Sequence, residues 1–188
     1  MKKVILLLGG ARSGKSHFAQ EYAQRDGEKV LFVATATAGD EDMRLRIAKH
    51  KKDRPSNWRT LEAITEIGTQ IEAHAGDAEL IIIDCITMLV NNIFSHYDEQ
   101  QFDSISDAVL EKEVIAEIEQ LQHCLKKVNA SFLIISNEVG LGLVPDNRMG
   151  RLYRDILGRA NQMLAQTADE VYLMVAGIPL RIKPKDIL

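Results

Sequence analysis

The amino-acid sequence predicts a three-layer α/β domain, in which helices cover both faces of a mainly parallel β-sheet. Short runs of apolar, mostly β-branched residues alternate along the chain with longer segments of helical period. Runs that are apolar at nearly every position are typical of parallel strands buried on both faces. Five runs are therefore expected to be strands, at 4–8, 30–34, 80–84, 132–136 and 171–175.

Five segments that flank these runs are expected to be helices. The clearest spans 106–128, because Ile118, Leu121 and Leu125 recur at helical spacing between charged residues. Asn147, which follows Asp146, resembles the N-cap of the last helix. The expected helices cover 15–25, 40–52, 61–74, 106–128 and 147–166.

The C-terminal part of the chain is expected to form a β-hairpin. Apolar segments at 171–176 and 180–183 flank a glycine-containing turn, Gly177-Ile178-Pro179. This hairpin adds an antiparallel edge to the sheet. The chain has 188 residues and shows no internal repeat, low-complexity tract or linker. We therefore expect a single domain over residues 1–188.

Composition restricts the classes of function. The sequence is 46% hydrophobic and 27% charged, which is typical of a globular protein. Its net charge of −4 argues against nucleic-acid binding, because nucleic-acid-binding domains carry a basic excess. No apolar run approaches the roughly 20 residues that cross a bilayer. Cys85 and Cys124 are far apart in the sequence, so they form no metal-ligand spacing and no disulfide framework is expected. This cysteine usage predicts a cytoplasmic location.

A glycine-rich loop follows the first expected strand and leads into the first expected helix. It matches the phosphate-loop pattern G-x-x-x-x-G-K-[ST] at every position, which disfavours the alternative of a chance turn. Its glycines let backbone N–H groups face a phosphate at a helix N-terminus. Lys15 is predicted to contact the β- and γ-phosphates of a nucleoside triphosphate, and Ser16 to bind Mg²⁺. The loop of this predicted P-loop nucleotide-binding domain reads Gly9-Gly10-Ala11-Arg12-Ser13-Gly14-Lys15-Ser16.

A second ligand for the metal ion is expected at the end of the strand at 80–84. Four apolar residues precede Asp84 there. A carboxylate at this point of a phosphate-loop protein is favoured as the partner of Mg²⁺, either directly or through water. The alternative is that Asp84 caps a helix that Thr87 and Met88 open.

A basic segment surrounds one histidine of this otherwise acidic protein. Six Lys or Arg residues fall among the eleven residues 44–54, and such a charge run is usually a solvated helical face. Met43, Ile47 and His50, however, are spaced to share one apolar stripe of a helix. Neighbouring cations keep an imidazole neutral, and a neutral imidazole can attack phosphorus. The residues leave two interpretations open: a buried structural histidine, which is slightly favoured, and a nucleophile.

Several motifs, taken in order, resemble one known family over nearly the whole chain, from about residue 4 to residue 183. That family is the bifunctional adenosylcobinamide kinase / adenosylcobinamide-phosphate guanylyltransferase of cobalamin biosynthesis. Besides the phosphate loop, the motifs are Arg46-Ile47-x-x-His50-x-x-x-Arg54-Pro55, Trp58-Arg59-Thr60-x-Glu62, Asn137-Glu138-Val139-Gly140, Val144-Pro145, Arg154-Asp155-Ile156-Leu157-Gly158-Arg159-x-Asn161-Gln162 and Ala168-Asp169-Glu170-Val171.

The resemblance implies two reactions. In the first, ATP or GTP phosphorylates the hydroxyl of the aminopropanol arm of adenosylcobinamide. In the second, GTP donates GMP to a histidine with release of pyrophosphate. The GMP then passes to adenosylcobinamide phosphate and gives adenosyl-GDP-cobinamide. The histidine that matches the family's guanylylated residue is His50, which moves the interpretation of His50 toward the nucleophile.

The resemblance also implies nucleotide contacts outside the phosphate loop and an assembly of three identical chains. A homotrimer is the implied oligomer, with the helix of His50 near a subunit boundary. Glu62 is one implied contact, although its position alone favours a solvated residue in the first turn of a helix. Some members of the family have glutamate at the position of Asp84, so the resemblance implies a carboxylate at this position but not how it contacts the metal ion. The implied contacts are Ala34, Thr35, Ala36, Lys51, Lys52, Asp53, Arg54 and Glu62.

Two other functions are compatible with a phosphate loop. A different small-molecule kinase explains the loop and Asp84, but it leaves the basic segment around His50 as plain surface. A non-enzymatic guanine-nucleotide switch usually carries Asn-Lys-x-Asp after a strand. The comparable place here reads Asn137-Glu138-Val139-Gly140, a segment for which the residues alone predict no role.

Overall fold

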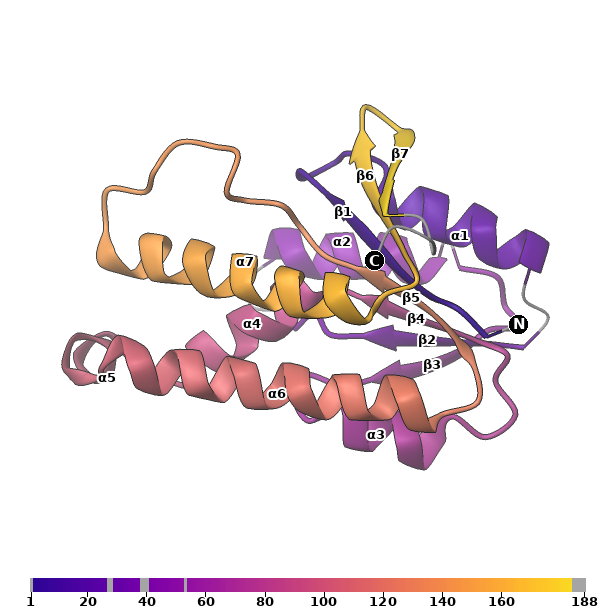
Figure 1. The fold of residues 1–188 in the computed structure, drawn as a ribbon, viewed down its shortest axis with the longest axis horizontal. Coiled ribbons are helices and arrows are strands. Elements are labelled where there is room, and N and C mark those ends of the chain that lie inside the picture. Colours follow the sequence, from indigo (N-terminus) through magenta and orange to yellow (C-terminus); the bar gives the residue numbers. More distant parts are fainter. Residues whose placement is uncertain (1, 27–28, 38–40, 53, 184–188) are drawn as a thin grey trace.

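The computed structural model describes residues 2–26, 29–37, 41–52 and 54–183. Its centre is a seven-stranded sheet with the order β3-β2-β4-β5-β1-β6-β7 (Figure 1). Neighbouring strands are parallel throughout, except for the antiparallel pair β6 and β7. The strands are β1 (Val4–Gly9), β2 (Val30–Ala34), β3 (Arg59–Glu62), β4 (Leu80–Asp84), β5 (Ser131–Ile135), β6 (Glu170–Val175) and β7 (Ile178–Lys183).

One face of the sheet carries most of the helices. A large apolar cluster joins strand residues such as Leu6, Ile83 and Ile134 to the inward sides of these helices. In Figure 1 the long helices α6 and α7 run side by side across this face, and α3 packs against α6. The helices of this layer are α3 (Ile67–His74), α4 (Ile86–Phe94), α5 (Glu99–Ser104), α6 (Asp107–Lys127) and α7 (Arg148–Thr167).

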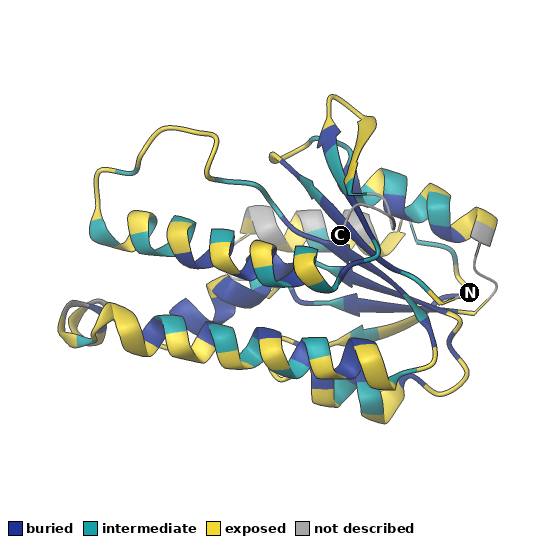
Figure 2. Cartoon of the chain, viewed as in Figure 1, coloured by how far each residue is buried: buried dark blue, intermediate teal, exposed yellow. Residues whose placement is uncertain are grey.

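The opposite face of the sheet is covered by α1 (Lys15–Asp26) and by a tryptophan from a loop. Ala19 and Ala23 of α1 belong to a second apolar cluster, together with alternate residues of the central strands. Trp58 stacks on Phe32 of β2, with 6.4 Å between ring centroids. Figure 2 shows that burial is concentrated in the central strands and in the helix faces turned toward them. The remaining helix, α2 (Glu41–Lys52), follows β2 in sequence.

Most elements expected from the sequence are confirmed. The five strands lie within one residue of the predicted runs, and the C-terminal hairpin is antiparallel. The helices expected at 15–25, 106–128 and 147–166 appear with bounds shifted by one residue, and α2 begins at Glu41. Asn147 is the N-cap of α7, as predicted, because its Oδ1 accepts a hydrogen bond from the backbone N–H of Gly150 at 2.7 Å. Local periodicity and capping therefore determine these elements.

The helix expected over 61–74 is wrong in its first half. The residues Arg59–Glu62 form β3, which pairs in parallel with β2, and the helix begins only at Ile67. Its first turn is capped from another helix, because the carboxylate of Glu117 accepts the backbone N–H groups of Glu66 and Ile67, each at 2.9 Å. A cap supplied from 50 residues away leaves no local signal. The helices α4 and α5 were not among the five expected from the sequence.

The turn of the C-terminal hairpin supports the phosphate loop. The turn expected at Gly177-Ile178-Pro179 is wrong in its last two residues, because Ile178 and Pro179 pair with β6 as the start of β7. Ala176 and Gly177 form the turn instead, with positive φ angles of 51° and 82°, as two-residue hairpin turns require. The backbone N–H of Gly177 donates to the carbonyl of Ser13 at 2.9 Å. A Cβ on Gly14, where φ is +96°, would lie 3.0 Å from the Cα of Gly177. Glycine is therefore required there both by the backbone angle and by the close approach of the hairpin.

Candidate functional site

The predicted metal ligands meet at the carboxyl edge of the sheet. β1 leads into the phosphate loop, β4 ends at Asp84, and β5 lies between these two strands. The hydroxyl of Ser16 donates to Oδ2 of Asp84 at 3.0 Å, although the two residues are 68 apart in sequence. The alternative role of Asp84 as a helix cap is wrong, because α4 begins at Ile86 with Cys85 as its N-cap. The structure thus places a hydroxyl and a carboxylate together beside the phosphate loop.

These two side chains fit a magnesium ion. Mg²⁺ prefers hard oxygen donors, and in phosphate-transfer sites it is usually held by one or two protein oxygens, together with substrate phosphates and water. The hydroxyl of Ser16 and the carboxylate of Asp84 supply such oxygens. Among the described residues, no group of three or more His, Cys, Asp or Glu side chains is placed to hold a metal ion without such help.

Lys15 is folded back onto the phosphate loop. Its Nζ donates to the carbonyl oxygens of Gly9 at 2.9 Å and Gly10 at 2.7 Å, and to the hydroxyl of Ser13 at 3.3 Å. The residue is 7% exposed. Burial lowers the pKa of Lys15, whereas the thiol of Cys85 and the carboxylate of Asp84 act in the opposite direction. The loop therefore encloses a cation that several backbone and side-chain oxygens stabilise.

Thr35 joins the carboxyl ends of β2 and β4. It is fully buried, and its hydroxyl lies 2.7 Å from both the backbone N–H and the carbonyl of Cys85. Its own carbonyl accepts a hydrogen bond from Nδ2 of Asn92 at 2.8 Å. Ala34 and Ala36, the other two residues predicted there, are half-buried on either side. The buried side chain of Thr35 thus fixes the backbone of Cys85, the residue that precedes helix α4.

A cationic cavity of about 630 Å³ lies between the end of α2 and β3. Lys51, Lys52, Arg54 and Glu62 line it, so it gathers four of the predicted nucleotide contacts. Lys51 forms an ion pair with Glu62 at 2.5 Å, and this hydrogen bond lowers the pKa of Glu62. The expectation that Glu62 lies in the first turn of a helix is wrong, since it is the last residue of β3.

Arg54 is the most constrained cation of this cavity. Its guanidinium carbon lies 3.7 Å from the centroid of the Phe32 ring, which is a cation–π arrangement. Its Nε and Nη1 are buried and have no hydrogen-bond partner among the described residues. Burial lowers the pKa of Arg54, against the opposing charges of Asp84 and Glu62. Buried guanidinium donors without partners are costly, so this position is suited to an anionic ligand.

The structure describes His50 only as a backbone position. His50 lies in the last turn of α2, directly before Lys51. The side chains of Met43 and His50, and the whole of Asp53, lie outside the described residues, so the predicted apolar stripe is described only through the half-buried Ile47. Among the described side chains, Lys51, the residue after the predicted nucleophile, is the first in sequence to line the cavity.

The segment after β5, for which the sequence predicted no role, lies beside the phosphate loop. The backbone N–H of Glu138 donates to the carbonyl of Gly9 at 3.0 Å. The backbone N–H of Asn137 donates to the hydroxyl of Thr87 at 2.8 Å, and its carbonyl accepts from Nδ2 of Asn161 at 3.0 Å. The sequence feature that indicated a place for this segment near the site was the position of its polar residues directly after a buried strand.

The described part of the chain contains no membrane-spanning helix. None of its helices combines the length and the apolar character that crossing a bilayer requires.

The fold and this site define a P-loop nucleotide-binding protein. A glycine loop between a strand and a helix, with a carboxylate ending a second strand, is the phosphate-binding arrangement of that class. The fold is similar to the crystal structure of the RadB recombinase, with a TM-score of 0.50 and 16% sequence identity. That similarity covers 91% of this chain and 73% of the recombinase chain, and it supports the fold alone.

Sequence comparison narrows the class to one family. Residues 5–182 match the family described as cobinamide kinase / cobinamide phosphate guanyltransferase. The bifunctional adenosylcobalamin biosynthesis protein CobU of Salmonella typhimurium is 41% identical over 96% of this chain and 99% of its own length. CobU of Escherichia coli is 38% identical over 96% and 99%, and CobP of Pseudomonas aeruginosa is 36% identical over 95% and 96%. The chain belongs to this family of bifunctional enzymes, which confirms the predicted resemblance.

Proposed function

We propose that this chain carries out both reactions of its family. It phosphorylates the aminopropanol hydroxyl of adenosylcobinamide with ATP or GTP, and it then transfers GMP from GTP to the resulting adenosylcobinamide phosphate. The products of the second reaction are adenosyl-GDP-cobinamide and pyrophosphate. The observation that carries the proposal is the pairing of Ser16 with Asp84 beside a complete phosphate loop, in a chain that matches the family from residue 5 to 182.

In the kinase reaction the phosphate loop holds the triphosphate. Lys15 exchanges its bonds to the carbonyl oxygens of Gly9 and Gly10 for bonds to phosphate oxygens, which are stronger acceptors. Ser16 and Asp84 hold Mg²⁺, which when bound neutralises charge on the phosphate groups. The hydroxyl oxygen of the acceptor forms a bond to the γ-phosphorus while the bond to the β–γ bridging oxygen breaks. The nucleoside diphosphate leaves, and the hydroxyl proton is released to water.

In the transfer reaction His50 serves as the nucleophile. An imidazole nitrogen bonds to the α-phosphorus of GTP while the bond to pyrophosphate breaks. A phosphate oxygen of adenosylcobinamide phosphate then bonds to the same phosphorus while the bond to His50 breaks. Positively charged residues that follow His50 in sequence support this role. Lys51 and Arg54 line the adjacent cavity, and Arg54 has buried N–H donors without partners among the described residues. Such donors stabilise the charge that develops as pyrophosphate departs.

The proposal includes an assembly and a location. We propose a homotrimer, which is supported by exposed apolar side chains on the C-terminal hairpin, among them Ile178, Leu180 and Ile182. Light scattering coupled to gel filtration tests this, since a trimer has three times the 21.0 kDa mass of one chain. We also propose a cytoplasmic location, which is supported by the two free cysteines, Cys85 and Cys124.

Labelling with radioactive GTP tests the histidine role directly. The protein is incubated with α-³²P-GTP and Mg²⁺ but without corrinoid, and then separated by denaturing electrophoresis. We expect a protein-bound label that is labile in acid and stable in alkali, as a phosphoramidate is. The variant His50→Ala should lose this label and keep substantial kinase activity. The matched control His123→Ala changes an exposed histidine of α6 and should keep both. Equal loss of both activities in His50→Ala would show that His50 is structural.

A further inference from the structure

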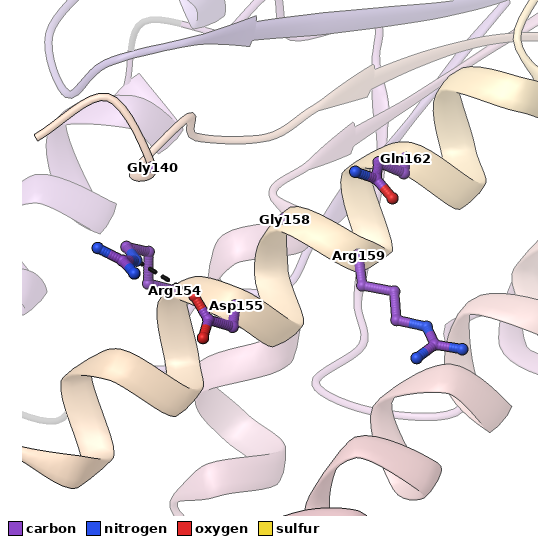
Figure 3. Close-up of a pocket in the computed structure, with 6 residues that line it drawn as sticks. All are labelled: Gly140, Arg154, Asp155, Gly158, Arg159 and Gln162. Carbon is purple, nitrogen blue, oxygen red and sulfur yellow. Dashed lines mark hydrogen bonds and ion pairs between the residues drawn. The ribbon is translucent and has the colours of Figure 1, made fainter. Parts of the chain in front are cut away.

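A second cavity, of about 560 Å³, lies between α7 and the segment that follows β5 (Figure 3). Among the described residues, neither the phosphate loop nor the basic segment 44–54 contributes to it. The nucleotide contacts predicted from the sequence that the structure describes do not line it either. Its lining residues are Gly140, Arg154, Asp155, Gly158, Arg159 and Gln162.

The spacing of residues along α7 explains how this cavity forms. Arg154, Gly158 and Gln162 follow one another at intervals of four, so they lie along one side of the helix. A Cβ built on Gly158 would meet no atom within 4 Å, so the glycine leaves open space between two long polar side chains. In Figure 3, Arg154 and Gln162 lie on the side of α7 nearer Gly140, whereas Arg159 points toward α6. There Arg159 forms an ion pair with Glu111 at 2.6 Å.

The wall of this cavity is joined to the phosphate loop by hydrogen bonds. Glu138 donates its backbone N–H to the carbonyl of Gly9 at 3.0 Å, and its Oε1 accepts the backbone N–H of Gly140 at 2.6 Å. Gly140 lies only two residues beyond Glu138, which corresponds to at most about 7 Å of extended chain. Asn161 fixes the same segment to α7 through the carbonyl of Asn137. A molecule held in this cavity therefore lies close to the loop that binds the triphosphate.

The cavity combines hydrogen-bonding groups of both kinds with apolar surroundings. Arg154 supplies donors and Asp155 acceptors, and the two form an ion pair of 3.2 Å with each other, whereas the amide of Gln162 supplies both kinds of group. Directly after Gly140, the apolar side chains of Leu141 and Leu143 are 83% and 96% exposed. A primary amide both donates and accepts hydrogen bonds, so it can pair with such a mixed set of groups, and exposed apolar side chains of this kind indicate a binding surface.

We infer that this cavity binds the corrinoid acceptor, holding one amide-bearing edge of its macrocycle while the exposed leucines contact its apolar face. This inference rests on the proposed function, since it assigns the acceptor side of the same kinase reaction. A corrinoid is a large apolar ring with amide side chains at its periphery, so it matches both features of the cavity. Binding there keeps the aminopropanol arm on the side of the phosphate loop.

Two variants of α7 and one matched control test the assignment. Gly158→Leu fills the open space with a side chain, and it replaces a helix residue of low propensity by one of high propensity. Gln162→Leu removes an amide from the wall. Gln166→Leu is the control, because Gln166 is an exposed glutamine one turn further along α7 and does not line the cavity. Adenosylcobinamide is the probe, its binding followed by equilibrium dialysis with detection of its visible absorbance.

We expect Gly158→Leu and Gln162→Leu to weaken adenosylcobinamide binding at least tenfold and to raise its KM in the kinase reaction, while Gln166→Leu behaves like the unaltered protein. Equal binding by all four proteins would overturn the inference and leave the proposed function standing. The inference would also be overturned if both cavity variants lost GTP labelling as well as corrinoid binding, because the loss of both indicates general damage to the fold. If the unaltered protein neither binds nor phosphorylates adenosylcobinamide, the proposed function itself fails.

Discussion

Replacing Thr35 by valine tests whether one buried hydroxyl holds the ends of β2 and β4 together. The hydroxyl accepts the N–H of Cys85 and donates to its carbonyl, both at 2.7 Å. Valine has nearly the same shape, so the change removes both hydrogen bonds without opening a cavity. The carbonyl of Cys85 keeps its bond from the N–H of Leu89 at 3.2 Å, but the N–H of Cys85 loses its partner.

The size of the effect follows from these contacts. A buried N–H left without a partner costs about 1–3 kcal/mol, and the lost bond to the carbonyl costs about 1 kcal/mol more. We therefore expect Thr35→Val to lower the free energy of unfolding by about 3 kcal/mol, which corresponds to roughly 6–12 °C in Tm for a chain of this size. Because Asp84 directly precedes Cys85, the KM for magnesium–ATP should rise as well.

Urea unfolding followed by circular dichroism measures the loss as a lower midpoint at an unchanged slope. Thr37→Val is the matched control, because Thr37 is exposed and its hydroxyl lies 3.5 Å from Oδ1 of Asn92, at the limit of a hydrogen bond. That control should stay within about 0.5 kcal/mol of the unaltered protein. If Thr35→Val also stays within that range, the hydroxyl does not join the two strands in the way described.

Two further predictions concern the phosphate loop and the thiol beside it. Lys15→Ala should reduce both the kinase rate and GTP labelling by at least about 10²-fold, because both reactions need the triphosphate held. Full retention of either, in initial-rate and labelling assays, would exclude a shared phosphate loop. Burial raises the pKa of Cys85 from its ordinary 9.0 to about 11. Between these two pH values the folded protein keeps the thiol proton, whereas the unfolded chain loses it. The contribution of Cys85 to the free energy of unfolding is therefore full below about pH 9 and disappears as the pH rises toward about 11. Urea midpoints should fall over that range, and less steeply in Cys85→Ala; identical slopes would show that other groups cause the decline.

Much of the candidate site is continuous in sequence, which is why it could be predicted. The phosphate loop needs only a strand, eight consecutive residues and a helix, and all three are read from local pattern. Asp84 was found because a single carboxylate ends a run of four apolar residues. The family resemblance rested on several motifs in fixed order, and its confirmation over residues 5–182 reflects that order.

The error over 61–74 shows where local pattern fails. The strand β3 is short and exposed, and it lies at the edge of the sheet, so it lacks the continuous apolar run that marked the buried strands. Its partner is β2, and the cap of the following helix comes from Glu117. Neither contact is between neighbours in sequence, so Glu62 was expected on a helix although it ends a strand beside Lys51.

The class of fold, the phosphate loop and the family could all be predicted from the amino-acid sequence, because each depends on short motifs whose residues are neighbours in the chain. Three features became evident only from the folded chain: β5 lies between β1 and β4, the hairpin turn at Gly177 contacts Gly14, and a cavity opens beside Gly158. These features depend on which strand pairs with which and on how helices pack against the sheet. Such contacts join residues far apart in sequence, and only the packing of the whole chain selects among the many pairings that local pattern allows.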